Sequence, residues 1–130
     1  MKIHHICIQT NCYEKSKKFY EEILGFKVVK ETPNFHGRDY NTWLELNGFM
    51  IELQTGKEPL AKYNKDSEGI VHFALYEKNI DEFVSKIKTM DSVQFKEKDG
   101  QIIYCVENSK LVKLIAPEGT IIEIRDCLNL

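Results

Sequence analysis

The chain has 130 residues, of which 42% are hydrophobic and 29% are charged, and its formal net charge is -2. This length and composition are typical of one globular domain with its own buried core. Acidic and basic residues are interspersed, which argues against a nucleic-acid-binding face, and no apolar run approaches the ~20 residues of a transmembrane helix.

Cysteine usage indicates a reducing compartment. The four cysteines, Cys7, Cys12, Cys105 and Cys127, show no C-x-x-C spacing, and the first residues lack the apolar stretch of a signal peptide. We therefore expect reduced thiols in a cytoplasmic protein. Cys7 lies two residues after His5 and shares its face of an expected strand, so it either lines a pocket or packs as a small apolar side chain.

The first elements along the chain are a strand and a helix. Residues 2–9 alternate between apolar and polar side chains, which predicts a strand. Asn11 followed by Glu14 resembles a capping box, and it predicts the start of a helix that Gly25 ends. The elements expected next are a strand over 26–30 and a polar loop around Pro33, Asn34 and Gly37.

A hairpin completes the first half. Asn47-Gly48 predicts a two-residue turn between strands over 40–46 and 49–55, because both residues accept a positive φ. Pairing outward from this turn places Trp43 opposite Glu52, and directly opposed residues share a face. The face of Glu52 then carries Trp43, Glu45, Met50 and Gln54, whereas Leu44, Ile51 and Leu53 form the core face.

The second half repeats this pattern. A polar segment over 57–68 predicts a linker between a first repeat over 1–56 and a second over 69–130. A strand over 69–76 holds His72, and Asn79 with Glu82 repeats the helix start. The remaining expected elements are a strand over 93–96, an added strand near 102–104 and a hairpin over 111–115 and 120–125. Each half reads βαβββ, so we expect an α+β fold in which two repeats form a curved mixed sheet around a metal-binding cavity.

Four residues at equivalent positions of the repeats suggest a metal site. His5 and Glu52 are 47 residues apart, and His72 and Glu123 are 51 apart. A glutamate in an otherwise apolar strand is unusual, because a buried carboxylate is costly without a cation. Two imidazoles and two carboxylates form a divalent-metal site with positions left for substrate. The competing interpretation is that both glutamates are exposed on their hairpins and the repeat is purely structural.

The ligand types limit the metal and the chemistry. Nitrogen and oxygen ligands suit Ni²⁺, Zn²⁺, Co²⁺, Fe²⁺ or Mn²⁺, and the spacing alone does not choose among them. We expect Ni²⁺ or Zn²⁺ first. Such an ion polarises a carbonyl and stabilises an enediolate, while a carboxylate at its edge moves a proton. This combination favours an isomerase that acts next to a carbonyl. His4 should face the other side of the strand from His5, which makes it a weaker ligand candidate.

Motifs along nearly the whole chain match one superfamily. They are His5 with Ser16 to Tyr20 and Leu24 to Phe26, then Met50 to Leu53, Val71 to Ala74, and Ala116 to Glu123. In these motifs the chain resembles the vicinal oxygen chelate superfamily, and its glyoxalase I (lactoylglutathione lyase) branch most closely.

The resemblance implies a paired βαβββ fold in a homodimer that acts on a small molecule. The charge distribution and the short apolar runs argue against nucleic-acid and membrane partners. It implies metal binding by His5, Glu52, His72 and Glu123. It also implies that Glu123, or else Glu52, is the catalytic base that converts the hemithioacetal of methylglyoxal and a thiol to a lactoyl thioester.

Two positions depart from the glyoxalase I pattern. Gln9 stands where that branch has an arginine that helps to hold glutathione, and Gly56 stands where it has an asparagine. Without the arginine, glutathione carboxylates lose a strong partner. The substrate can therefore be an adduct of a different thiol or a compound that is not a thiol adduct. The substrate-binding candidates are Trp43, Gln9 and Cys7.

Two other functions stay open at this point. The segment from Pro59 to Tyr63, together with Gly69, Ile70 and His72, also resembles methylmalonyl-CoA epimerase. A metal-free module that sequesters a ligand would instead use an aromatic groove, for which Trp43, Tyr40 and Tyr104 are the candidates.

Overall fold

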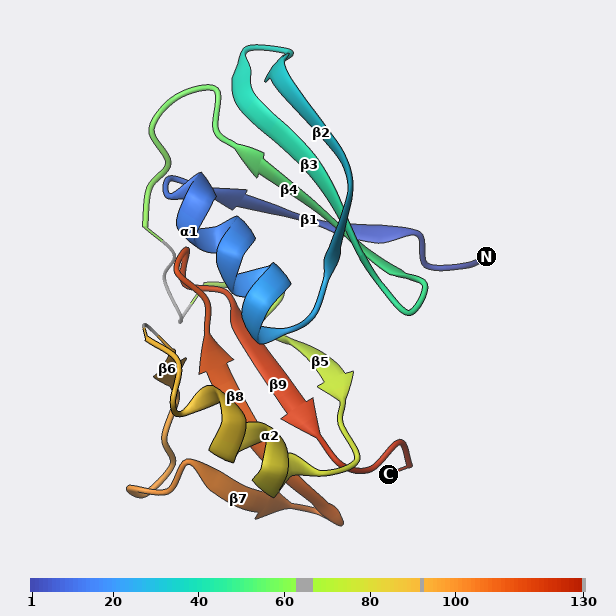
Figure 1. Ribbon diagram of the computed structural model, residues 1–130, viewed down its shortest axis with the longest axis vertical. Helices are drawn as coiled ribbons and strands as arrows, with labels where there is room; N and C mark the ends of the chain where they lie inside the picture. Colours follow the sequence, from blue (N-terminus) through green and yellow to red (C-terminus); the bar gives the residue numbers. More distant parts are fainter. Residues whose placement is uncertain (63–66, 92, 130) are drawn as a thin grey trace. The chain divides into compact units, whose positions relative to one another are not determined.

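The computed structural model describes residues 1–62, 67–91 and 93–129. These residues form two compact units, Met1–Lys62 and Tyr63–Leu130, and each has its own sheet (Figure 1). The expected α+β class is confirmed. The boundary between the units falls within the segment 57–68 that the sequence marks as a linker, although residues 63–66 of that segment lie outside the described residues.

The first unit is a βαβββ module. Its elements are β1 (His5–Thr10), α1 (Tyr13–Lys18) with its π-helical continuation η1 (Phe19–Ile23), β2 (Lys27–Phe35), β3 (Arg38–Leu46) and β4 (Phe49–Thr55). The strand order is β1-β4-β3-β2, with β1 parallel to β4 and the other neighbours antiparallel. In Figure 1 this sheet runs from blue to green.

The register of the first hairpin is as the sequence predicts. Trp43 pairs with Glu52, and Asn47 and Gly48 both have positive φ, 49° and 85°. Leu44 and Ile51 on the opposite face are fully buried. Glu52 therefore lies on the face turned away from this core, which is the face that β1 shares through its pairing with β4.

The predicted start of the first helix is wrong. The helix begins at Tyr13 with Cys12 as its N-cap residue, and no side chain caps it. The side chain of Asn11 instead bonds Leu60, donating to its carbonyl at 2.9 Å and accepting from its amide at 3.0 Å. A partner distant in sequence therefore takes the amide group that the local pattern assigns to the helix. The predicted end is confirmed, because Gly25 follows the helix with a φ of 81°.

The predicted loop around Pro33 is also wrong, because β2 continues to Phe35. β2 is an edge strand, and an edge tolerates a residue that has no N–H to donate. The connection to β3 is the two-residue turn His36-Gly37, in which both residues have positive φ. Histidine adopts this conformation less readily than asparagine, so the turn is hard to see in the sequence.

The second unit repeats the module with an added strand. Its elements are β5 (Phe73–Tyr76), α2 (Ile80–Ile87), β6 (Gln94–Phe95), β7 (Ile103–Val106), β8 (Ser109–Ile115) and β9 (Ile121–Arg125). The order is β5-β9-β8-β6, and β7 also pairs with β8. The expected added strand is thus confirmed as β7. β5 is shorter than the predicted 69–76, so His72 lies directly before the strand rather than within it.

The second helix begins as predicted. Asn79 accepts a hydrogen bond from the Glu82 amide at 3.1 Å and donates one to the Glu82 carboxylate at 3.1 Å. The buried side of α2 contacts β8, where Val112 and Leu114 are fully buried. The side chains of Glu123 and Lys113 therefore extend from the opposite face of this sheet. Among the described residues, no helix has the length and apolar character needed to cross a membrane.

Candidate metal-binding site

The first unit brings His5 and Glu52 together. β1 and β4 are parallel neighbours, and their register places both side chains on one face. The His5 Nε2 atom lies 3.5 Å from Glu52 Oε2. Two ligands bound to one tetrahedral ion through bonds of about 2.1 Å would lie about 3.4 Å apart. The pair therefore has the spacing of two adjacent ligands of one metal ion.

Neighbouring side chains fix the orientation of this pair. Buried Asn41 donates from Nδ2 to Glu52 Oε1 at 2.7 Å, which leaves Oε2 directed at His5. The His4 and His5 Nδ1 atoms lie 2.8 Å apart, and the Trp43 ring packs edge-on against His5 with centroids 4.8 Å apart. When His5 donates from Nδ1, its Nε2 keeps a lone pair that can bind a metal.

The prediction that His4 faces away from His5 is wrong. His4 precedes β1, which starts at His5, so strand alternation does not apply to it. Its ring also lies edge-on to Trp43, at 6.2 Å between centroids. His4 and Asn41 are thus positioning residues for the pair, and neither role has a local signature in the sequence.

The second unit brings His72 and Glu123 together in the same way. The His72 Nε2 atom lies 3.6 Å from Glu123 Oε2. Glu123 is only 6% exposed, which excludes the interpretation that it is a solvated hairpin residue. Two cations that the sequence reasoning missed flank it: Lys113 Nζ lies 3.5 Å from Oε2, and Arg125 Nη1 lies 3.6 Å from Oε1.

The two pairs fit a divalent ion in donor type and spacing, but neither forms a complete site. Within residues 1–62, 67–91 and 93–129, no group of three or more His, Cys, Asp or Glu side chains is arranged to hold a metal. The buried Nδ1 atom of His72 has no hydrogen-bond partner among these residues, so nothing there fixes which nitrogen of its ring carries the proton. The metal site with four ligands therefore stays a prediction, and it requires that both pairs bind the same ion.

Cys7 lies beside Glu52 on the same face. Its side chain is solvent-exposed, which favours the pocket-lining interpretation over packing in the core. Partial burial of the sulfur, together with the negative charge of Glu52 and a hydrogen bond to it, raises the pKa of Cys7 to about 11. Cys7 is therefore a neutral thiol next to the carboxylate at physiological pH.

The two departures from the glyoxalase I pattern have structural explanations. Gln9 accepts a hydrogen bond from Arg38 Nη1 at 3.3 Å, and the same nitrogen donates to the Thr55 carbonyl at 2.8 Å. A guanidinium from β3 thus reaches the position where an arginine is missing from β1. At Gly56, an added Cβ would lie 2.5 Å from the Glu58 carbonyl oxygen, so a side chain does not fit there.

Two of the three aromatic residues named for a ligand groove, Tyr40 and Trp43, lie on opposite faces of the first sheet. Tyr40 lies on the helix side of the first sheet, where its ring stacks on Tyr13 with centroids 4.4 Å apart. Trp43 is three residues further along β3 and faces the other side, toward His5. Tyr104 belongs to the second unit, where burial and then the charge of Glu123 raise its pKa. Tyr40 therefore cannot line a groove together with Trp43, which the strand alternation already implies.

Family models identify the class of protein. Residues 2–102 match the model of the Glyoxalase/Bleomycin resistance protein/Dioxygenase superfamily, and the chain belongs to this superfamily. The resemblance seen in the sequence is confirmed at this level, and the superfamily includes enzymes such as glyoxalase I. The match includes His5, Glu52 and His72, whereas Lys113 and Glu123 lie beyond it.

Individual relatives extend this finding. The uncharacterized protein YwkD of Bacillus subtilis (strain 168) is 37% identical over 87 residues, which are 65% of this chain and 68% of YwkD. A glyoxalase family protein from Enterococcus faecalis has a similar structure, with a TM-score of 0.79, 22% identity, and coverage of 95% of this chain and 96% of that one.

Two further structures share the fold at lower identity. A V278E mutant of glyoxalase I from Zea mays gives a TM-score of 0.78 at 17% identity, over 98% of this chain and 45% of that one. The fosfomycin resistance protein FosX from Listeria monocytogenes, complexed with Mn(II) and sulfate, gives 0.73 at 14% identity, over 97% and 92%.

Proposed function

We propose that this protein is a metal-dependent isomerase, similar to glyoxalase I, that moves a proton next to a carbonyl group. The observation that carries the proposal is the repeated His–Glu pair. Each pair has its histidine at the first strand of a unit and its glutamate on the parallel neighbour of that strand. The nitrogen–oxygen distances are 3.5 Å and 3.6 Å. The FosX structure with Mn(II) supports divalent-metal binding by this fold.

The proposed ligands are His5, Glu52, His72 and Glu123. A divalent ion held there would polarise the carbonyl oxygen of the substrate. The proton on the carbon next to that carbonyl passes to a glutamate, which returns it to the former carbonyl carbon, while the hydroxyl proton of the substrate moves to the former carbonyl oxygen. Glu123 is the first candidate for this step and Glu52 the second. The transfer is an isomerisation, so it needs no oxidant or reductant.

The substrate that this chemistry fits best is the hemithioacetal of methylglyoxal and a thiol, which becomes a lactoyl thioester. Arg38 favours a thiol compound that carries a negatively charged group, because a guanidinium binds such groups. This guanidinium lies beside Gln9 on the face that carries Glu52. The accessible thiol of Cys7 and the ring of Trp43 line the same face and would contact the substrate.

The first test is metal content together with activity. After loading with Ni²⁺ or Zn²⁺, the purified protein should bind about one ion per chain and form thioester from methylglyoxal and at least one thiol. His5→Ala and His72→Ala should each lower the metal occupancy. Wild-type protein that stays empty after loading would refute the proposal. If none of several thiols gives a thioester, but a CoA ester in deuterated water takes up deuterium, the protein would instead be an epimerase.

A second test asks which chains supply the ligands of one ion. We propose a homodimer in which the two pairs come together either within one chain or between two chains. His5→Ala lacks a working first pair, and His72→Ala lacks a working second pair. If pairs join between chains, mixing the two inactive variants restores one intact site per heterodimer and part of the activity. If each chain completes its own site, the mixture stays inactive.

A further inference from the structure

In the second unit two cations lie beside Glu123, although one positive charge would balance its carboxylate. Lys113 and Arg125 lie 3.5 Å and 3.6 Å from its two oxygens, and their side chains are 22% and 23% exposed. Within the described part of the chain, Glu123 is the only carboxylate that pairs with either cation. One negative charge therefore faces two positive ones, both partly withdrawn from water.

The first unit handles its glutamate differently. The residue paired with Glu52 is Trp43, whereas the residue paired with Glu123 at the equivalent strand position is Lys113. Besides His5 and Cys7, Glu52 is contacted by the neutral amide of Asn41. The two halves thus keep the same His–Glu geometry but differ in the charge beside it. The first unit holds the same His–Glu pair beside a neutral amide, so the pair itself does not require Lys113 and Arg125.

The excess charge increases once a metal is bound, and this step rests on the proposed function. A divalent ion together with Glu52 and Glu123 is neutral when both histidines are neutral. Lys113 and Arg125 then have no carboxylate of their own to balance them. A partly buried, unbalanced cation is unfavourable, and an anionic group of the substrate would relieve it.

Arg125 is already held in position for such a group. Its Nε and Nη2 atoms donate to Ser109 Oγ at 3.2 Å and 2.9 Å. These bonds fix the guanidinium plane and leave Nη1 on the side of Glu123. Preorganised guanidinium groups bind carboxylate and phosphate oxygens through two parallel hydrogen bonds.

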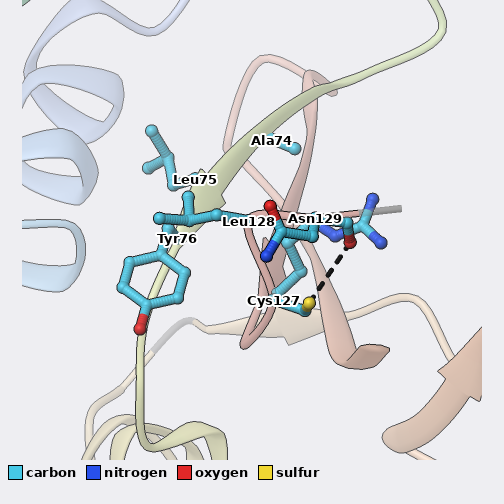
Figure 2. Close-up of a pocket in the computed structure, with 7 residues that line it drawn as sticks. Ala74, Leu75, Tyr76, Cys127, Leu128 and Asn129 are labelled. Atoms are coloured by element: carbon cyan, nitrogen blue, oxygen red, sulfur yellow. Dashed lines mark hydrogen bonds between the residues drawn. The ribbon is translucent and has the colours of Figure 1, made fainter. Parts of the chain in front are cut away.

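A small cavity lies next to Arg125. It has a volume of about 140 Å³, and besides Arg125 its lining includes Ala74, Tyr76 and Leu128 (Figure 2). Ala74 pairs with Glu123 and Tyr76 pairs with Arg125 along β5 and β9, so these side chains share the face of the metal-ligand candidate. A cavity of this size accommodates a group of about the size of benzene.

We propose that Lys113 and Arg125 bind an oxyanion, either a carboxylate or a phosphate, carried by the substrate of this enzyme. The apolar part of the substrate beside that oxyanion extends into the cavity lined by Ala74, Tyr76 and Leu128. The substrate class is thus a small anionic carbonyl compound or its thiol adduct, oriented with its negative end toward the second unit.

The test compares adducts of methylglyoxal that differ in charge. The thiols are 3-mercaptopropionate, 2-mercaptoethyl phosphate and neutral 2-mercaptoethanol, each used with the Zn²⁺- or Ni²⁺-loaded protein. Lys113→Met should lower kcat/KM for the charged adducts about tenfold to hundredfold more than for the neutral adduct, through KM. The two charged thiols show whether a carboxylate or a phosphate is preferred. Lys113→Arg should restore the preference for anions.

Lys110→Met is the matched control, because Lys110 lies on the same strand but pairs with Asp81. It should change none of these values. An equal loss for charged and neutral adducts in Lys113→Met would show that Lys113 only neutralises Glu123, and it would overturn the proposal. If Lys113→Met does not fold, Lys113→Gln takes its place with the same expected outcome.

A measurement without turnover separates this proposal from the proposed function. Inorganic phosphate is titrated into the metal-loaded and the metal-free protein while the backbone amide signals of Ser109, Lys113 and Arg125 are followed by NMR. Saturable shifts that Lys113→Met weakens about tenfold or more support the oxyanion site, even when no thioester is formed. Wild-type protein without saturable shifts at these residues, while thioester formation proceeds, would refute the oxyanion site alone.

Discussion

The change Glu123→Gln tests how the buried carboxylate is stabilised when no metal is bound. Glutamine keeps the volume of the side chain and removes its charge. It leaves Lys113 and Arg125 facing a neutral amide at 3.5–3.6 Å. The variant should therefore be less stable than the wild type in the presence of a chelator.

The magnitude follows from the exposure of the two cations. Removing one partner of a buried ion pair typically costs about 3–5 kcal/mol, because the other charge is left without compensation. The side chains of Lys113 and Arg125 are 22% and 23% exposed, so each regains some hydration and the expected loss falls to about 2–3 kcal/mol. For 130 residues the unfolding entropy is about 0.27 kcal/mol/K, which gives a decrease in Tm of about 7–11 °C.

The assay is thermal unfolding followed by circular dichroism, with Glu52→Gln as the matched control. Glu52 has no Lys or Arg in an ion pair with it among the described residues, and glutamine can still accept the bond from Asn41. Its expected loss is below about 1 kcal/mol, or less than about 4 °C. A Glu123→Gln protein as stable as the wild type, or more stable, would refute the reasoning. It would mean that the burial of the charge already outweighs its ion pairs.

Two further variants test the fold. Asn79→Ala removes the cap of α2 and should lower the stability by about 1 kcal/mol with some loss of helical signal, whereas Asn11→Ala should leave the helical signal unchanged, as measured by far-UV circular dichroism. An equal loss of helical signal in both variants would contradict the assignment of Asn79, and not Asn11, as a helix cap. Glu31→Gln probes acid stability. Hydrogen bonds from Lys17 and then Tyr13 lower the pKa of Glu31, so their contribution is present above its unfolded-state value of about 4.3 and is lost as the pH falls through the lowered value. Denaturant unfolding curves of wild type and Glu31→Gln should differ by about 0.5 kcal/mol at pH 7 and converge in acid; a gap that persists below pH 2 would show that charge is not its source.

Local chemistry explains what the sequence could predict. Asn47-Gly48 strongly favours one hairpin turn, so the pairing of Trp43 with Glu52 follows from this dipeptide and the strand period. The second hairpin lacks such a turn signal. Pairing outward from predicted strands that end at 115 and begin at 120 would place Val112 opposite Glu123, whereas the observed partner is Lys113.

Tertiary partners explain what the sequence could not predict. Asn11 and Asn79 begin the same Asn-x-x-Glu pattern, yet only Asn79 caps a helix, because Leu60 takes the amide of Asn11. Arg38 reaches Gln9 across β4 from the first position of β3, directly after a turn that carries histidine instead of asparagine. Neither contact can be recognised from the residues that are adjacent to it in the sequence.

The division of the four candidate ligands between two compact units has a consequence for how tightly a metal is held. Under the proposed function each His–Glu pair would act as a bidentate chelator, and bidentate binding by itself is weak. When both pairs bind the same ion, the second contact is made at the effective concentration set by whatever tethers the pairs, which is the linker in one chain or the interface in a dimer. Metal affinity would then depend on that tether. If one chain supplies both pairs, substitutions in the segment 57–68, far from any ligand, would change the affinity without altering the pairs themselves.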